Sequence, residues 1–158
     1  MIQLAHVLSI KTLHIHSDSF LENGLIPMRY TCDGLNVSPS LTVKFIPSNA
    51  ISLVIIMEDP DAPINTWVHW LTWNIPVTQH IGENSKLGIE GLNDFCKNYY
   101  CGPCPMAGTH HYVFKVYALD ALLNLKKNTK KHELEKAMSS HVVAYGDIVG
   151  LYRRNKTI

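Results

Sequence analysis

The stretch that decides the fold is ISLVIIMEDPDAP, residues 51–63. Residues 51–57 form a nearly continuous apolar run rich in Ile and Val, which is typical of a strand buried on both faces. The run stops at residues 59–63, where two prolines restrict the backbone and the residues that precede them. We therefore predict a buried strand that ends in a rigid turn with two carboxylates, Asp59 and Asp61.

Alternating apolar and polar residues on both sides of this stretch predict further strands. They lie at about residues 13–16, 41–45, 67–75, 112–119 and 148–152. One helix is expected over residues 130–141, because apolar side chains recur there at helical spacing. Two long segments rich in Gly, Pro, Asn and Asp, residues 21–40 and 78–108, are expected to be loops. The pattern is that of a mostly β domain with one or two helices.

Length and composition exclude several classes of protein. The chain has 158 residues, which fit a single domain over 1–158, and its 46% apolar and 17% charged residues exclude disorder. Basic residues exceed acidic ones by only 14 − 13 = 1, so no positive surplus favours nucleic acid as a partner. No segment reaches the ~18 consecutive apolar residues that an integral membrane helix needs.

The N-terminus gives an expectation about the compartment. Residues 1–10 are mildly apolar but contain His6, and they lack the order of charge, apolar run and small residues of a secretory signal. We therefore expect a cytoplasmic protein whose cysteines are reduced thiols. The four cysteines are Cys32, Cys96, Cys101 and Cys104.

The sequence Cys-Gly-Pro-Cys, residues 101–104, has the spacing of a thioredoxin-type redox motif. Such a motif needs a helix N-terminus to stabilise its thiolate, but Pro105, Gly108 and a predicted strand follow here instead. A zinc site that adds His110 and His111 is disfavoured as well, since adjacent residues on a strand point in opposite directions.

Two predicted strands carry histidines that could share a site with the aspartate turn. Alternation places His69 on one face with Trp67, Leu71 and Trp73. In Gly-Thr-His-His-Tyr, residues 108–112, strand parity places His110 and Tyr112 on one face and His111 on the other. Imidazole and phenol at this spacing can donate two hydrogen bonds into one cavity. Spacing alone favours the structural alternatives, which are a rigid turn, a core histidine and a surface histidine pair.

Taken in order, these segments resemble the phosphatidylethanolamine-binding protein family, and within it the bacterial and archaeal Raf-kinase-inhibitor-like branch. The resemblance runs from about residue 13 to 154. Its motifs are YTCDG (30–34), DPDAP (59–63), WVHW (67–70), GPCP (102–105) and GTHHY (108–112). It implies a mostly β fold, a β-sandwich with a large central sheet and one or two peripheral helices.

The resemblance also implies a pocket for phosphate-like anions and phospholipid head groups at one end of the central sheet. The positions that match its ligand-binding residues are Asp59, Asp61, His69, Tyr100, Gly102, Pro103, His110 and Tyr112. Two imidazoles, a phenol and backbone N–H groups are donors suited to an anion, and a nearby carboxylate favours a charged histidine. We expect no cofactor and no metal. The resemblance also makes protein partners and a homodimer possible assemblies of this chain.

The sequence departs from the family pattern at several positions. His111 stands where Arg is usual, although strand parity points it away from the pocket. Cys101 replaces a usual glycine, and Met106 with Ala107 stands where a second proline is common. Soon after Tyr152 the chain ends, whereas animal members continue into a helix that helps to close the pocket. Lipid specificity and kinase regulation are therefore left open.

We expect a non-enzymatic protein that binds a small anion or a phosphate group. One alternative is a hydrolase that uses His69 or His110 as acid and base with Asp59 as the orienting carboxylate. Another is a redox or zinc protein built on Cys101 and Cys104. The sequence has neither a Gly-rich phosphate loop nor a Gly-x-Ser-x-Gly motif.

Overall fold

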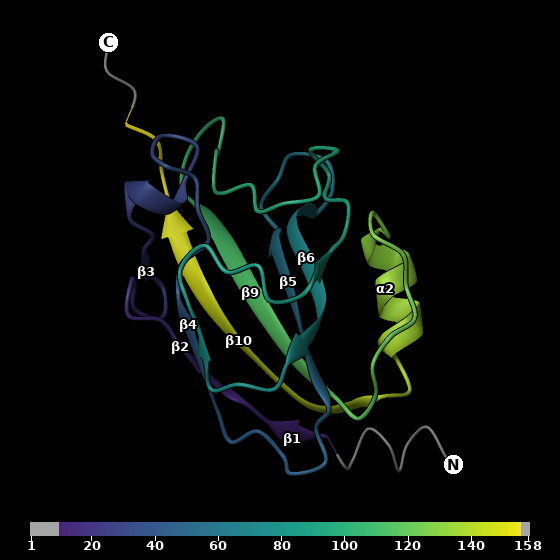
Figure 1. Cartoon of the computed structure of the whole chain (residues 1–158). Coiled ribbons are helices and arrows are strands. Elements are labelled where there is room, and N and C mark those ends of the chain that lie inside the picture. Colours follow the sequence, from purple (N-terminus) through teal and green to yellow (C-terminus); the bar gives the residue numbers. More distant parts are fainter. Residues whose placement is uncertain (1–9, 156–158) are drawn as a thin grey trace.

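Two β-sheets and one α-helix make up the described part of the chain, residues 10–155 of the computed structural model (Figure 1). The strands are β1 (Lys11–Thr12), β2 (His14–His16), β3 (Gly24–Leu25), β4 (Leu41–Lys44), β5 (Ser52–Asp59), β6 (Trp67–Pro76), β7 (His80–Ile81), β8 (Ile89–Glu90), β9 (His110–Leu119) and β10 (Val142–Tyr152). The helices are the 3₁₀ turn η1 (Met28–Tyr30) and the α-helix α2 (Lys131–Met138). The mostly β prediction is confirmed.

The larger sheet has the strand order β1-β10-β9-β5-β6-β8, with β3 also paired to β10. Its four long strands β10, β9, β5 and β6 pair antiparallel with one another, while β1 and β3 run parallel to β10. The smaller sheet has the order β2-β4-β7. Together the two sheets form the expected sandwich around a large central sheet.

The central sheet is buried on both faces, as the apolar run in β5 predicts. One face packs with the small sheet, and Leu53 and Ile55 of β5 lie in that core. The other face packs against α2, and Val54 and Ile56 lie there with Leu134 of the helix. Figure 1 accordingly shows α2 and the small strands β2 and β4 on opposite sides of the long strands. Burial of alternate residues on each face explains why the run shows no polar alternation.

Two element boundaries differ from the prediction. The helix ends at Met138 rather than near residue 141, and the N–H of His141 bonds the carbonyl of Met138 in a turn. The last strand then begins at Val142, so β10 has 11 residues and spans the whole length of β9. The sequence pattern did not predict the start of β10. Every second residue of this strand is only partly buried or exposed.

The prediction that His69 shares one strand face with Leu71 and Trp73 is wrong, because β6 is irregular at two points. Pairing with β5 moves from Met57–Trp70 to Glu58–Val68, which leaves His69 as an extra residue in a bulge. Such bulges turn a side chain away from simple alternation and are common beside functional sites. A second shift lies near Asn74, which has a φ of 55°. As a result Leu71 and Trp73 pack in the core under α2, away from His69.

The register brings the ends of four strands to one end of the sheet. Asp59, the last residue of β5, pairs with Trp67, the first of β6. His110, the first residue of β9, pairs with Tyr152, the last of β10. The aspartate turn and both histidine-bearing strands therefore meet there.

The prediction about a leader in residues 1–10 falls almost entirely outside the described residues. No described helix is long and apolar enough to cross a membrane.

Candidate functional site

A carboxylate–histidine pair stands at the end of the central sheet. Asp59 accepts a hydrogen bond at Oδ2 from Nδ1 of His110 over 2.7 Å, and its Oδ1 accepts the N–H of Asp61 over 2.8 Å. Both side chains are largely buried, with 6% of Asp59 and 13% of His110 exposed. Because Nδ1 is held by the carboxylate, Nε2 is the nitrogen of His110 that is left for a ligand.

His69 lies beside this pair but is held by a different group. Its Nδ1 bonds the carbonyl oxygen of Cys101 over 2.6 Å. Its own backbone carbonyl, in the bulge of β6, accepts the N–H of Cys101 and the side-chain amide of Asn93. The ring meets Phe95 and Tyr112 edge to face. Burial lowers the pKa of His69, and this outweighs the neighbouring carboxylate of Asp59 and the carbonyl of Cys101, which raise it.

Tyr112 completes the set and carries an unsatisfied polar group. Its ring is fully buried, 5.3 Å from the ring of His69 and stacked 6.4 Å from that of His110 between centroids. Its hydroxyl is buried and has no hydrogen-bond partner among the described residues. Burial and the charge of Asp59 raise the pKa of Tyr112, so the group stays a phenol that can donate. Buried polar groups are nearly always paired, so this hydroxyl, which lies near the Asp59 carboxylate and the Cys104 backbone, is a candidate donor to a ligand in the site.

These side chains surround one cavity of about 250 Å³. The structure thus brings together Asp59, His69, His110 and Tyr112, four of the eight residues predicted for the site. The other lining residues were missed and are mostly apolar: Ala62, Pro63, Trp67, Phe95, Cys104, Pro105 and Met106. Pro63 and Trp67 lie within recognised motifs, whereas Phe95 lies in an aperiodic loop where the sequence gives no signal.

Asp61 does not line the cavity, although it was predicted as a ligand-binding residue. Its Oδ2 accepts hydrogen bonds from both the backbone N–H and Nδ1 of His111, each over 2.7 Å. These bonds hold the pKa of Asp61 below its usual value. His111 is exposed and faces away from the cavity, as strand parity predicts. The two residues instead fasten the aspartate turn to the start of β9.

Tyr100, Gly102 and Pro103 also lie outside the cavity lining, on the loop behind it. The Tyr100 hydroxyl donates to the carbonyl of Tyr30 over 2.7 Å, and the Gly102 N–H donates to Asn36 over 2.7 Å. A side chain at Gly102 would place Cβ 2.1 Å from the Tyr30 carbonyl oxygen, so only glycine fits. These residues position the loop that carries Cys101 and Cys104.

A disulfide joins Cys104 to Cys32, which corrects the prediction that all four cysteines are reduced thiols. The two residues are 72 positions apart, and the local spacing drew attention to Cys101 instead. Cys96 and Cys101 are free, and burial raises the pKa of the Cys101 thiol. The bond ties a cavity-lining residue to the loop after η1. Among residues 10–155 no three His, Cys, Asp or Glu side chains are placed to share a metal ion.

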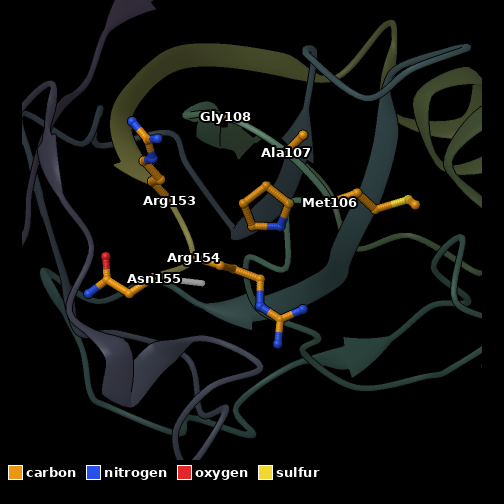
Figure 2. Close-up of a pocket in the computed structure, with 7 residues that line it drawn as sticks. Met106, Ala107, Gly108, Arg153, Arg154 and Asn155 are labelled. Atoms are coloured by element: carbon orange, nitrogen blue, oxygen red, sulfur yellow. The ribbon is translucent and has the colours of Figure 1, made fainter. Parts of the chain in front are cut away.

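A second, larger groove of about 580 Å³ adjoins the first and shares Pro105 and Met106 with it. Figure 2 shows that its two arginines, Arg153 and Arg154, point in different directions. Arg154 is bound to the carboxylate of Asp33 over 2.8 Å. The guanidinium groups therefore do not converge on one ligand, and the smaller cavity is the candidate site.

The sequence profile described as Phosphatidylethanolamine-binding protein matches residues 16–153 of this chain. The chain belongs to the phosphatidylethanolamine-binding protein family. A UPF0098 protein of Pyrococcus horikoshii is 49% identical over 149 residues, which are 87% of this chain and 75% of the relative. A UPF0098 protein of Chlamydia trachomatis is 35% identical over 150 residues, which are 90% of this chain and 100% of the relative.

Solved structures agree with membership of the phosphatidylethanolamine-binding protein family. A putative phosphatidylethanolamine-binding protein homologue from Chlamydia trachomatis superposes with a TM-score of 0.88 at 34% identity, covering 92% of this chain and 99% of the other. Escherichia coli YbcL, described as a member of the mammalian family, gives 0.83 at 25% identity, with 90% and 99% covered. The family and fold predicted from the motifs are confirmed.

Proposed function

We propose that this protein binds a phosphate-like anion in the cavity between His69, His110 and Tyr112, and that it does so without catalysing a reaction. The observation that supports this most directly is the buried Tyr112 hydroxyl, which has no partner and lies beside the Asp59-held His110. A phenol and an imidazolium are both hydrogen-bond donors, and bonds from a charged donor to an anion are roughly twice as strong as neutral ones.

The mouth of the cavity favours an anion that carries an organic group. Pro63, Trp67, Phe95 and Met106 line it, and all but Pro63 are large apolar side chains with more than a third of their surface exposed. An organic part of the ligand would cover them, and burying apolar surface contributes about 25 cal/mol per Å². A phosphorylated head group or another phosphate ester fits this combination of polar floor and apolar mouth.

The enzymatic alternatives find less support in the geometry. A hydrolase that forms a covalent intermediate would need a side-chain nucleophile, but Asp59 already accepts two hydrogen bonds and Cys104 is in a disulfide. The redox alternative needs Cys101 and Cys104 to act together, and Cys104 is bonded to Cys32. A binding role needs only the hydrogen-bonding side chains that line the cavity.

A cytoplasmic location and a homodimer also belong to this proposal. Disulfides are rare in the cytosol of most organisms but common in intracellular proteins of hyperthermophiles. Alkylation of free thiols in intact cells, followed by mass spectrometry, measures whether Cys32 and Cys104 are bonded there. Sedimentation of the purified protein measures its oligomeric state.

The test of the function is titration calorimetry with inorganic phosphate, followed by a phosphate ester. We expect His110→Ala and Tyr112→Phe each to weaken binding by about 1.5–3 kcal/mol, the scale of one hydrogen bond to a charged group. His111→Ala is the matched control, since His111 faces away from the cavity, and it should change little. No phosphate binding, or an equal loss from His111→Ala, would refute the proposed site.

A further inference from the structure

The hydrogen bond between His69 and Cys101 fixes which ring nitrogen carries the hydrogen. A carbonyl oxygen only accepts, so Nδ1 must be the donor across the 2.6 Å contact. In a neutral imidazole the other nitrogen then has a lone pair and no hydrogen. No hydrogen bond joins Nε2 of His69 to a described residue by distance and angle, and the ring lines the cavity. An uncharged His69 therefore offers the cavity an acceptor, not the donor that the sequence suggested.

The surroundings of His69 decide whether the ring is charged near neutral pH. Burial lowers its pKa, while the backbone of Cys101 and Gly102 and the carboxylates of Asp59 on β5 and Asp94 in the loop before Phe95 act in the opposite direction. From β9 it faces His110 and the phenol of Tyr112. Burial dominates, so the pKa lies below the ordinary ~6.5 and the ring is neutral at physiological pH.

The cavity therefore combines unlike polar groups. Tyr112 can donate from its hydroxyl, but neutral His69 only accepts. An oxyanion without hydrogens would set an oxygen lone pair against the lone pair of His69. A phosphoryl group that keeps one hydroxyl instead satisfies both, with P–O–H donating to His69 and P–O⁻ accepting from Tyr112.

We propose that His69 is the specificity-determining acceptor of the cavity and selects phosphoryl groups that retain one P–O–H hydrogen. This inference rests on the anion-binding function proposed above. Inorganic hydrogen phosphate keeps such a hydrogen throughout the neutral range, and a phosphate monoester keeps it below its second ionisation near ~6. Sulfate and phosphodiester groups have none.

The first test compares hydrogen phosphate with sulfate by calorimetry at pH ~7.5, where both are mainly dianions of similar size. We expect phosphate to bind roughly tenfold tighter or more, because sulfate leaves the buried acceptor unpaired. On acidification below the pKa of His69, Nε2 gains a hydrogen and the preference should shift toward sulfate. Equal affinities at pH ~7.5 would overturn this inference and leave the anion site standing, whereas no binding of either anion would overturn both.

The second test uses His69→Asn, whose side-chain amide can still donate to the Cys101 carbonyl but lacks Nε2. We expect the ratio of phosphate to sulfate affinity to fall toward one, and the exposed control His111→Asn to keep the wild-type ratio. Retention of the full preference in His69→Asn would contradict the proposal. Should that variant not fold, ¹H–¹⁵N correlation spectra of the unaltered protein report the tautomer directly, and a hydrogen on Nε2 of His69 at pH ~7.5 would contradict it as well.

A third measurement separates a free phosphate from a phosphate ester as the source of the group. Methyl phosphate loses its last hydrogen between pH ~5.5 and ~8, whereas inorganic phosphate keeps one. The affinity of methyl phosphate relative to inorganic phosphate should therefore fall about tenfold over this range. A constant ratio would count against selection of the P–O–H group, and tighter binding of the ester at low pH would identify esters as the preferred source.

Discussion

The rings of His69 and Tyr112 meet edge to face with centroids 5.3 Å apart, although their strands are not neighbours in the sheet. Strand β5 lies between β6 and β9, and it ends at Asp59. The bulge at His69 lies opposite Met57 and Glu58, and Glu58 also pairs with Val113 of β9, so the two rings meet over the last residues of β5. The cavity therefore lies at the end of β5, beside the point where β6 bulges.

The first prediction concerns Asp59, which fixes the orientation of His110. Asp59→Asn removes the negative charge that faces His110 Nδ1, so we expect phosphate affinity at pH ~6 to fall by about 1.5–3 kcal/mol. Calorimetry measures the change. Asp61→Asn is the matched control because that carboxylate bonds His111 outside the cavity. Equal losses in both variants would show that the turn as a whole, and not Asp59, sets the affinity.

The second prediction concerns the disulfide between Cys32 and Cys104. Removing it frees a loop of 72 residues in the unfolded chain, so Cys32→Ser should lower the free energy of unfolding by about 2–4 kcal/mol. Urea denaturation measures the loss, and reductant should reproduce it in the wild-type protein. Cys96→Ser, at an exposed free cysteine, should leave stability unchanged. A wild-type curve insensitive to reductant would argue that the bond contributes little.

Much of the fold and the four polar residues of the site could be predicted from sequence, and the reasons for the rest are physical. His110, His111 and Tyr112 lie on a regular strand, so parity alone gives their directions correctly. His69 lies in a bulge, and alternation therefore placed it wrongly with Leu71 and Trp73. The Cys32–Cys104 bond and the position of Phe95 depend on how two long loops fold over the sheet, which no local pattern encodes.

The third prediction concerns Glu58, a carboxylate of β5 that is 5% exposed. It pairs with Lys115 of β9 and Lys131 of α2, and so fastens the helix to the sheet. Burial alone would raise the pKa of Glu58, but the hydrogen bonds from the two lysines lower it overall. We expect Glu58→Gln to cost about 1–3 kcal/mol of unfolding free energy, measured by urea denaturation at neutral pH. Glu135→Gln on the exposed side of α2 is the control, and an equal cost there would contradict the role given to Glu58.

The last prediction follows from the lowered pKa of His69. Unfolded His69 takes up a proton near pH ~6.5, but the folded protein resists this, so the unfolded state binds more protons in the interval below ~6.5. Stability from this group is fully present above ~6.5, falls as the pH drops toward the folded-state pKa, and levels off beneath it. Urea denaturation at several pH values between ~5 and ~8 should show this decline in the wild-type protein. His69→Asn should flatten it, because Asn does not titrate, while His132→Asn at an exposed helix position should leave the slope unchanged. A wild-type slope of the opposite sign that disappears in His69→Asn would mean that His69 is charged in the folded state and donates from both ring nitrogens. A slope that persists in His69→Asn would show that other groups carry it and would contradict the prediction.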